Sequence, residues 1–139
     1  MVVDSHTLSI RTSREGEVVD ITDQVQELVN GSKLSDGIAF LFVPGSTAAL
    51  TTIEYEPGLV SDFPAALDRL VPKNILYEHE KRWHDGNGQS HVKAALLGPD
   101  IAVPFQKRKL MLGTWQQIVF VELDVRPRQR EVIVQLIGE

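Results

Sequence analysis

Apolar and polar positions along the chain follow patterns that predict mainly short strands. Residues 7–11 (TLSIR) alternate between polar and apolar side chains, which is typical of a strand with one buried face. Residues 38–43 (IAFLFV) are apolar throughout, which predicts a strand buried on both faces. Further β-favouring segments are found at 18–19, 50–55, 101–105, 110–112, 116–123 and 131–137. The pattern therefore predicts a protein built largely from β-structure.

Two helices are expected between the early strands. Thr22 can act as the N-cap of the first, which ends near residue 30. A proline-glycine turn precedes the second helix, which Ser61 or Asp62 can cap. Pro64 is compatible with that helix because it then falls within the first turn, where no backbone N–H is needed.

A third helix is expected after a loop at about 75–88. Asn87 or Ser90 can cap it, and Gly98-Pro99 provides its stop signal. No repeat, linker or low-complexity segment divides the chain, so residues 1–139 are expected to form a single domain. Seven or so strands with two or three short helices predict an α+β fold. Its sheet is expected to be curled and mostly antiparallel, either two-layered or barrel-like.

The composition narrows the classes of function. The chain has 139 residues and a net charge of −5, and its lack of cysteine excludes disulfides, thiolate catalysis and thiolate metal ligands. Nucleic-acid-binding proteins usually carry a net basic face, so nucleic acid is not an expected partner. No segment approaches the roughly 20 apolar residues that span a bilayer, and the N-terminus lacks the features of a signal peptide. We therefore expect a cytoplasmic protein with no membrane partner.

Three of the four histidines lie in the segment HEKRWHDGNGQSHVK, at His79, His84 and His91. Their spacing differs from the helical H-E-x-x-H zinc motif. A flexible loop can still bring them together around a divalent metal, with an oxygen from Asp85 or Glu54. The alternative is that His79 and His84 are solvated loop residues and that His91 is a donor at the start of a helix.

Two small-residue loops are candidate anion sites. The turn around Asn87 can present backbone N–H groups to a phosphate at the start of the following helix, with Lys93 nearby. It is equally compatible with a plain turn. In the second loop, at 44–49 (PGSTAA), Ser46 and Thr47 can donate to an anion, although hydroxyls in turns usually bond locally.

The remaining candidates are spread along the sequence. Glu54 lies in a β-favouring stretch, where a carboxylate needs a partner if it is buried; an edge position facing water is the alternative. Trp115 and Gln116 can line a pocket for a flat heterocycle or simply pack at the edge of the core. Three arginines can hold a small anion: Arg126, Arg128 and Arg130. No nucleophile elbow or phosphate-binding P-loop motif is present.

Several motifs, taken in order, identify the chain as similar to the YjbQ-like family, also called the secondary thiamine-phosphate synthase enzyme family. These are FVPGSTAAL (42–50), YEH (77–79), NGQSHVKAALLGP (87–99), LGTWQQI (112–118) and VQLIGE (134–139). The resemblance covers nearly the whole chain. It implies a compact α+β fold with a curled sheet, assembled as a homotrimer.

The resemblance also implies a pocket near a subunit interface, where histidines gather and can hold a metal such as zinc. Family members are linked to a thiamine-phosphate synthase side activity, which joins a pyrimidine diphosphate to a thiazole phosphate. The family pattern falls on these residues of this chain: Glu54, His79, Asp85, Asn87, His91, Thr114, Trp115 and Gln116. Many members carry a histidine where this chain has Gly45, and we hypothesise that His84 replaces it as a metal ligand with His79 and His91.

Three functions follow as alternatives. In a transferase of the thiamine-phosphate synthase type, Glu54, Asp85 and His91 are the expected catalytic residues. A diphosphate leaving group needs charge neutralisation, normally by Mg²⁺ or by basic side chains such as Lys93 and Arg126. The second alternative is a protein that binds a metal or phosphorylated ligand without turnover. The third is a metal-dependent hydrolase with Glu54 or Asp85 as general base.

Overall fold

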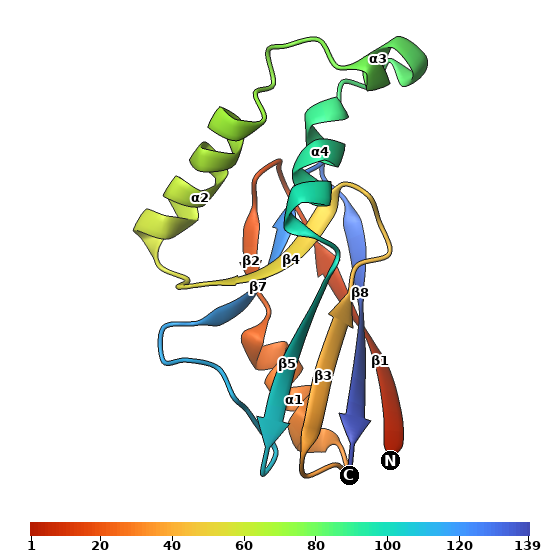
Figure 1. The fold of residues 1–139 in the computed structure, drawn as a ribbon, viewed down its shortest axis with the longest axis vertical. Coiled ribbons are helices and arrows are strands. Elements are labelled where there is room, and N and C mark those ends of the chain that lie inside the picture. The colour runs from red at the N-terminus through yellow and green to blue at the C-terminus, as the bar shows by residue number, and fades with distance from the viewer.

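The computed structural model describes all 139 residues, which form eight strands and four helices (Figure 1). In chain order these are β1 (Val2–Arg11), β2 (Val18–Asp20), α1 (Thr22–Gly31), β3 (Gly37–Phe42), β4 (Ala48–Ile53), α2 (Pro57–Leu70), α3 (Glu78–Trp83), α4 (Gly88–Leu97), β5 (Asp100–Gln106), β6 (Lys109–Leu110), β7 (Gln117–Glu122) and β8 (Gln129–Gly138). The longest helix, α2, has 14 residues, and no helix is both long and apolar enough to cross a bilayer.

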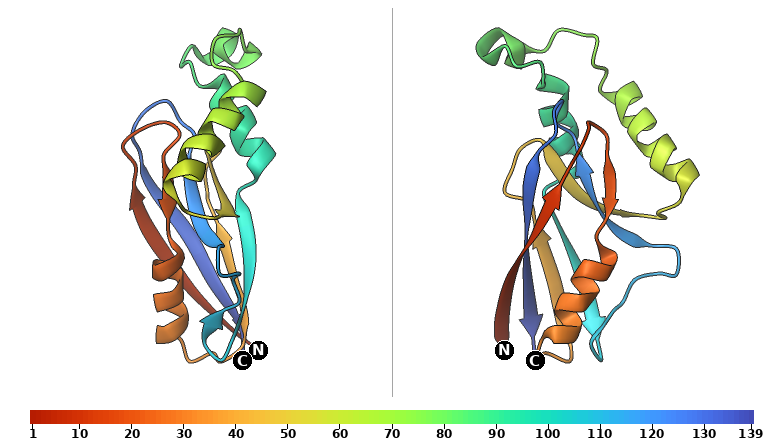
Figure 2. Two further views of the ribbon diagram at one scale, coloured as in Figure 1. Left: turned by 90° about the vertical axis from the view of Figure 1, so that its left-hand side faces the viewer. Right: turned by 180° about the vertical axis from the view of Figure 1, so that it is seen from behind.

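The strands form two antiparallel sheets. One has the order β1-β8-β3-β5-β6 and the other has the order β2-β7-β4. Figure 2 shows the larger sheet curling along the length of the molecule, with α1 lying on one side of it. The predicted α+β class, with a curled antiparallel sheet in a single domain, is confirmed.

The main hydrophobic core lies between the two sheets and α1. Val25 and Val29 of α1 pack with Leu41 of β3, Val134 of β8 and Phe120 of β7. Each of these side chains is fully enclosed. Burial of these apolar side chains in one shared core therefore holds the two sheets and α1 together.

A second, smaller apolar cluster joins α2 and α4 to the other side of the three-stranded sheet. Leu67 of α2 and Ala94 of α4 pack against Val119 and Val121 of β7. Alternate residues of β7 point to opposite faces, so this strand contributes to both clusters. Strand β7 is therefore buried on both faces.

The prediction that residues 38–43 form a strand buried on both faces was wrong. Ala39 and Leu41 of β3 are fully buried, but Ile38 is 47% exposed and Phe42 36% exposed. Ile38 pairs directly with Ile137 of β8. The residues of β3 and β8 that point away from α1 thus form an uncovered apolar surface, which we call the outer sheet face (Figure 1).

The predicted caps of two helices were also wrong. The hydroxyl of Thr22 does not cap α1 but accepts a hydrogen bond from the backbone N–H of Ile118 at 2.9 Å. Helix α2 begins at Pro57 and is capped by Glu56, whose carboxylate accepts from the N–H of Gly58 at 2.8 Å. Because α2 starts earlier than predicted, Pro64 lies inside the helix and not in its first turn.

Local turn chemistry otherwise agrees with the prediction. The helix predicted after the 75–88 loop is α4, which begins after Asn87 and ends before Gly98. Asn87 makes no side-chain capping bond. The loop at 75–88 contains the short helix α3, which the sequence pattern did not reveal. Lys107 and Arg108 form the tight turn between β5 and β6, with φ angles of 52° and 60°.

Candidate functional site

Two histidines from different helices meet at one end of the molecule. His79 lies on α3 and His91 on α4, and their ring centroids are 4.4 Å apart with 47° between the ring planes. Gly88 permits this approach, because a Cβ at its position would lie 2.6 Å from Cβ of Tyr77. Its N–H also donates to Oε1 of Glu80 at 2.7 Å, which fixes the start of α4 against α3.

The imidazole of His79 is held by two polar residues of the following turn. Its Nε2 lies 3.3 Å from Oδ1 of Asp85. When the side-chain amide nitrogen of Asn87 points towards His79 and Asp85, it donates to Oδ1 of Asp85 at 2.8 Å and to Nε2 of His79 at 3.0 Å. In the opposite orientation it donates to Oδ1 of Asp124 at 3.4 Å. The shorter contacts favour the first orientation, because an amide oxygen 2.8 Å from a carboxylate would be repelled.

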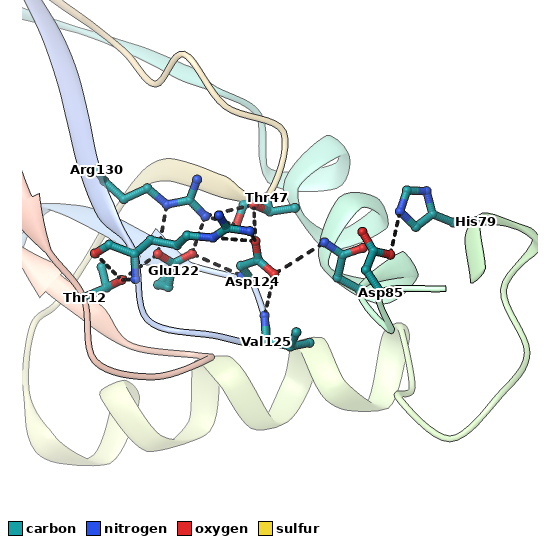
Figure 3. Close-up of polar contacts among 10 residues, drawn as sticks. Thr12, Thr47, His79, Asp85, Glu122, Asp124, Val125 and Arg130 are labelled. Carbon is teal, nitrogen blue, oxygen red and sulfur yellow. Dashed lines mark hydrogen bonds and ion pairs between the residues drawn. The ribbon is translucent and has the colours of Figure 1, made fainter. Parts of the chain in front are cut away.

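This geometry accommodates His79 with or without a second proton. A neutral Nε2 accepts from the Asn87 amide, whereas a protonated Nε2 donates to Asp85. Figure 3 shows the contact between His79 and Asp85 at the edge of a longer polar chain. His91 therefore lies beside an imidazole that the carboxylate of Asp85 and the amide of Asn87 hold in place.

A hollow of about 220 Å³ lies between the 44–47 loop and α4. Gly45 and Ser46 belong to the loop side of this hollow, and His91 belongs to the helix side. The other lining residues are small and apolar: Ala48, Ala94, Ala95 and Pro99. His91 is thus the residue that joins the histidine pair to the hollow, which we call the α4 hollow.

Next to the loop, two buried carboxylates are neutralised by two arginines (Figure 3). Arg130 donates through Nε at 2.9 Å and Nη2 at 2.6 Å to the two oxygens of Glu122, which is fully buried. Arg128 donates through Nε at 2.9 Å and Nη2 at 2.6 Å to Oδ2 of Asp124, which is 1% exposed. The Arg130–Glu122 contact is bidentate, which is the strong form of an ion pair, whereas Arg128 directs both donors to one oxygen of Asp124. The four charges sum to zero.

Thr47 connects the 44–47 loop to both ion pairs. Its Oγ1 accepts from Nη2 of Arg130 at 2.8 Å and donates to Oδ2 of Asp124 at 3.2 Å. Its carbonyl oxygen accepts from the N–H of Leu123 at 3.0 Å. The loop wall of the α4 hollow is therefore anchored to the end of β7.

Asp124 should make the protein sensitive to acid. Burial by itself raises the pKa of Asp124, but hydrogen bonds from Arg128 and from the Val125 N–H, with the Arg128 charge, hold the pKa below its ordinary value of 3.8. A carboxylate whose folded pKa is lowered stabilises the fold above its unfolded pKa and loses that contribution as the pH falls through the folded pKa. We expect Asp124→Asn to lower the free energy of unfolding by about 1–3 kcal/mol near neutral pH.

The difference between wild type and Asp124→Asn should shrink below pH 3.8, where the wild-type carboxylate becomes protonated. Urea denaturation on both sides of that pH measures it. Asp62→Asn, at an exposed position of α2, is the matched control and should show no such trend. A difference that stays constant with pH would contradict the assignment.

The sequence and structure have clear relatives. The family model described as "UPF0047 protein YjbQ-like" matches residues 6–139. This chain belongs to the YjbQ-like family. A UPF0047 protein of Archaeoglobus fulgidus is 41% identical over 92% of this chain and 97% of its own length. The UPF0047 protein YugU of Bacillus subtilis is 33% identical over 95% of this chain and 98% of its own length.

Solved structures of YjbQ-like proteins share the fold. A YbjQ-like protein of Sulfolobus solfataricus superposes with a TM-score of 0.89 at 34% identity, covering 99% of this chain and 100% of its own. A yjbq/upf0047 family protein of Clostridium acetobutylicum gives a TM-score of 0.86 at 37% identity, covering 95% of this chain and 99% of its own. The family suggested by the sequence motifs is confirmed.

Within this YjbQ-like chain, five of the thirteen predicted site residues come together. His79, Asp85 and Asn87 form one polar cluster, His91 joins it to the α4 hollow, and Ser46 belongs to the lining of that hollow. Thr47 is buried in the arginine–carboxylate network and does not line the hollow. The site is therefore assembled from the 44–47 loop, α3 and the start of α4.

The other predicted residues lie elsewhere in the monomer. Glu54, Thr114 and Trp115 line a separate hollow of about 420 Å³ that shares no residue with the α4 hollow. Gln116 donates to Oγ1 of Thr52 at 3.0 Å, at the edge of β4. A single subunit thus does not bring these residues to the histidines.

The two predicted cations also lie outside the α4 hollow. Lys93 is 3% exposed, and its Nζ is paired with Oδ1 of Asp68 on α2 at 2.6 Å. It lies two positions after His91, which places it on a different side of α4. Arg126 is exposed and makes no hydrogen bond or ion pair within the chain. Neither cation contributes charge to the hollow in this structure.

The hypothesis that His84 completes a three-histidine metal site is not supported by the structure. His84 ends α3 in the left-handed conformation, with φ of 56°, and its side chain is exposed. No group of three or more histidine, cysteine, aspartate or glutamate side chains is close enough to hold a metal ion. The donor set of one chain therefore does not fit a metal.

Metal analysis provides a direct check. Because His84 lies outside the histidine pair, we expect His84→Ala to leave the metal content of purified protein unchanged. Any bound metal should instead decrease in His79→Ala, which removes one of the two adjacent imidazoles. Atomic emission spectroscopy of the three proteins after identical purification measures this. Metal that is lost in His84→Ala as well as in His79→Ala would restore the three-histidine hypothesis.

Sequence reasoning missed the role of the buried ion pairs. Glu122 and Asp124 lie two residues apart within an otherwise apolar stretch. Arg128 and Arg130 are also two residues apart, just before β8 and at its start. Residues two apart in strands share a face, and buried charges are almost always paired. The two-residue spacing of the carboxylates and of the arginines was therefore the sequence feature from which the ion pairs could have been predicted.

Proposed function

We propose that this protein is a cytoplasmic enzyme of the secondary thiamine-phosphate synthase type, which acts on phosphorylated small molecules in the α4 hollow. The proposed reaction joins a pyrimidine diphosphate to a thiazole phosphate. One observation carries the proposal: His91, in ring contact with His79, lines a small hollow whose remaining wall is largely apolar. Ligand pockets typically combine such apolar walls with few polar groups.

The proposed reaction is a displacement of diphosphate by the thiazole nitrogen, so the protein has to position the two substrates and assist the departure of the diphosphate. The bond between the pyrimidine methylene carbon and the diphosphate oxygen breaks, and its electron pair leaves on the diphosphate. The thiazole nitrogen supplies the pair for the new carbon–nitrogen bond, so neither ring loses a proton. In this proposal His91 donates a proton to the departing diphosphate, and the ring contact with His79, which Asp85 and Asn87 hold, supports the position of His91.

The α4 hollow also suits the size of one ring and its phosphate better than that of a large substrate. Its volume of about 220 Å³ in one chain lies below the roughly 300 Å³ at which ligand pockets usually begin. The site would be enlarged if a second subunit closed over it. A subunit interface is therefore compatible with this hollow.

The proposal is tested by incubating purified protein with both phosphorylated precursors and measuring thiamine phosphate by chromatography. Product formation that depends on His91 supports an enzyme. Saturable binding of either precursor without product would favour a non-catalytic binding protein. Absence of both binding and product, beside an active control synthase, would reject the proposal.

We further propose a homotrimer, for which the outer sheet face supplies the support. Ile38, Phe42 and Ile137 lie on this surface, and no helix of the chain covers it. Uncovered apolar patches of this kind usually mark interaction sites. Native mass spectrometry should give three times the monomer mass, and Ile38→Asp should shift it towards the monomer. A monomeric wild type at micromolar concentration would contradict this.

A further inference from the structure

Arg130 has one terminal nitrogen that the ion-pair network leaves free. Nε and Nη2 are occupied by Glu122 and Thr47, whereas Nη1 donates no hydrogen bond within the chain. In Figure 3 no dashed line reaches that nitrogen. Three side-chain polar atoms are buried without a hydrogen-bond partner, and Nη1 of Arg130 is not one of them. Because Nη1 has no partner within the chain, it must be accessible to solvent. Arg130 therefore has two N–H donors available for a ligand.

The free nitrogen lies beside Gly45, at a place where the chain has no side chain. A Cβ at Gly45 would be 3.3 Å from Nη1 of Arg130 and 3.8 Å from Cγ1 of Val43. Gly45 is exposed and also belongs to the lining of the α4 hollow. A ligand oxygen in this space would be within about hydrogen-bonding distance of the guanidinium.

Two backbone donors of the same loop are also unpaired. Neither the N–H of Ser46 nor that of Thr47 donates a hydrogen bond within the chain, although Gly45 donates to the carbonyl of Val43 at 3.0 Å. Consecutive unpaired N–H groups in a turn form a common binding site for anions. Thr47 is held rigidly by its bonds to Arg130 and Asp124, so the loop is fixed before a ligand binds.

We propose that Arg130 and the backbone of Ser46 and Thr47 form a phosphate-binding site at the mouth of the α4 hollow. The expected ligand is a phosphate or diphosphate ester whose remaining group is small and apolar. Its anion would lie against Nη1 in the space beside Gly45. The rest of the molecule would then extend along Ala94 and Ala95 towards His91. The site deepens the proposed function, because it says where the phosphate of the substrate binds. It rests on the proposed function only for the identity of the organic group attached to that phosphate.

Glu122 limits how tightly the site holds an anion. Its carboxylate already neutralises Arg130, so the ligand gains hydrogen bonds from Nη1 and the loop but little net Coulomb attraction. A diphosphate, with more acceptor oxygens, should therefore bind more tightly than inorganic phosphate. The carboxylate also keeps the guanidinium oriented, so the donors are preorganised.

The decisive variant is Gly45→Asp, which places a carboxylate beside Nη1 and occupies the site from within the chain. Gly45 does not have a positive φ angle, so the substitution causes no backbone strain. Gly31→Asp is the matched control, because it adds the same charge at an exposed glycine with no neighbouring atoms within 4 Å. Arg130→Ala is avoided because it would leave the buried carboxylate of Glu122 without its counterion.

Binding of inorganic phosphate and of diphosphate is measured by isothermal titration calorimetry, and amide shifts are followed by NMR. In wild type and Gly31→Asp we expect saturable binding that shifts the amide signals of Ser46 and Thr47. In Gly45→Asp the affinity should fall about tenfold or more, as expected for loss of charge-assisted hydrogen bonds. Equal affinity in both variants, or no binding in wild type, would overturn the site. Phosphate binding without thiamine phosphate synthesis would reject the proposed function alone, and synthesis that Gly45→Asp leaves unchanged would reject this site alone.

Discussion

His91→Ala is expected to lower kcat for thiamine phosphate synthesis by roughly 100- to 10,000-fold, the usual range for loss of a general acid or base. His91 is the residue that both lines the α4 hollow and contacts the His79 ring. The effect should appear mainly in kcat, because the proposed phosphate donors on the 44–47 loop are untouched. Steady-state kinetics with both precursors varied in turn provides the measurement.

Two other histidine variants serve as controls for this prediction. His6 lies on β1 and has only Asp4 as a polar neighbour, at 3.1 Å, so His6→Ala should retain full activity. His79→Ala should lose less activity than His91→Ala, since His79 does not line the hollow. Equal activity of His91→Ala and His6→Ala would remove His91 from the mechanism.

Glu122→Ala is expected to lower the free energy of unfolding by about 3–5 kcal/mol, which is typical when one partner of a buried ion pair is removed. Glu122 is fully buried and accepts from Thr12 Oγ1 at 2.7 Å as well as from Arg130. Without it, the guanidinium of Arg130, whose side chain is 13% exposed, keeps its charge with no counterion. Urea denaturation followed by circular dichroism provides the measurement.

The matched control is Glu131→Ala, at an exposed position of β8, which should change stability by no more than about 0.5 kcal/mol. The double variant Glu122→Leu with Arg130→Met tests the ion pair itself. It should lose less stability than the sum of the single changes, because no unpaired charge remains. Additive losses would show that Glu122 acts through packing and not through its charge.

The main architecture could be predicted from the sequence because the hydrophobic pattern has a clear physical cause. Alternation along β1 and the glycine and proline stops placed most elements within a few residues of their positions. The wrong assignment of β3 as a strand buried on both faces has an equally physical reason. Strand β3 and the centre of β7 are both apolar, and only tertiary packing determines that Ile38 faces outwards while Val119 faces a second cluster.

Much of the candidate site depends on contacts between distant parts of the chain. The histidine pair was foreseeable because His79 and His91 are close in sequence and flank a glycine-rich turn. By contrast, Thr12 and Glu122 are 110 positions apart, and Thr47 and Arg130 are 83 apart. No local pattern reports such pairing. The cap of α2 was missed because glutamate is less usual there than the nearby serine and aspartate.

Strand β7 has a consequence for the cooperativity of the protein. Ile118 and Phe120 belong to one apolar cluster, and Val119 and Val121 belong to the other. Neither cluster can open without exposing the strand that the second cluster needs, so the two are coupled into one unfolding unit. His91 lies on α4, which packs through Ala94 onto that second cluster. Amide exchange along β7 therefore reports opening of the α4 end and of the α1 end as a single event.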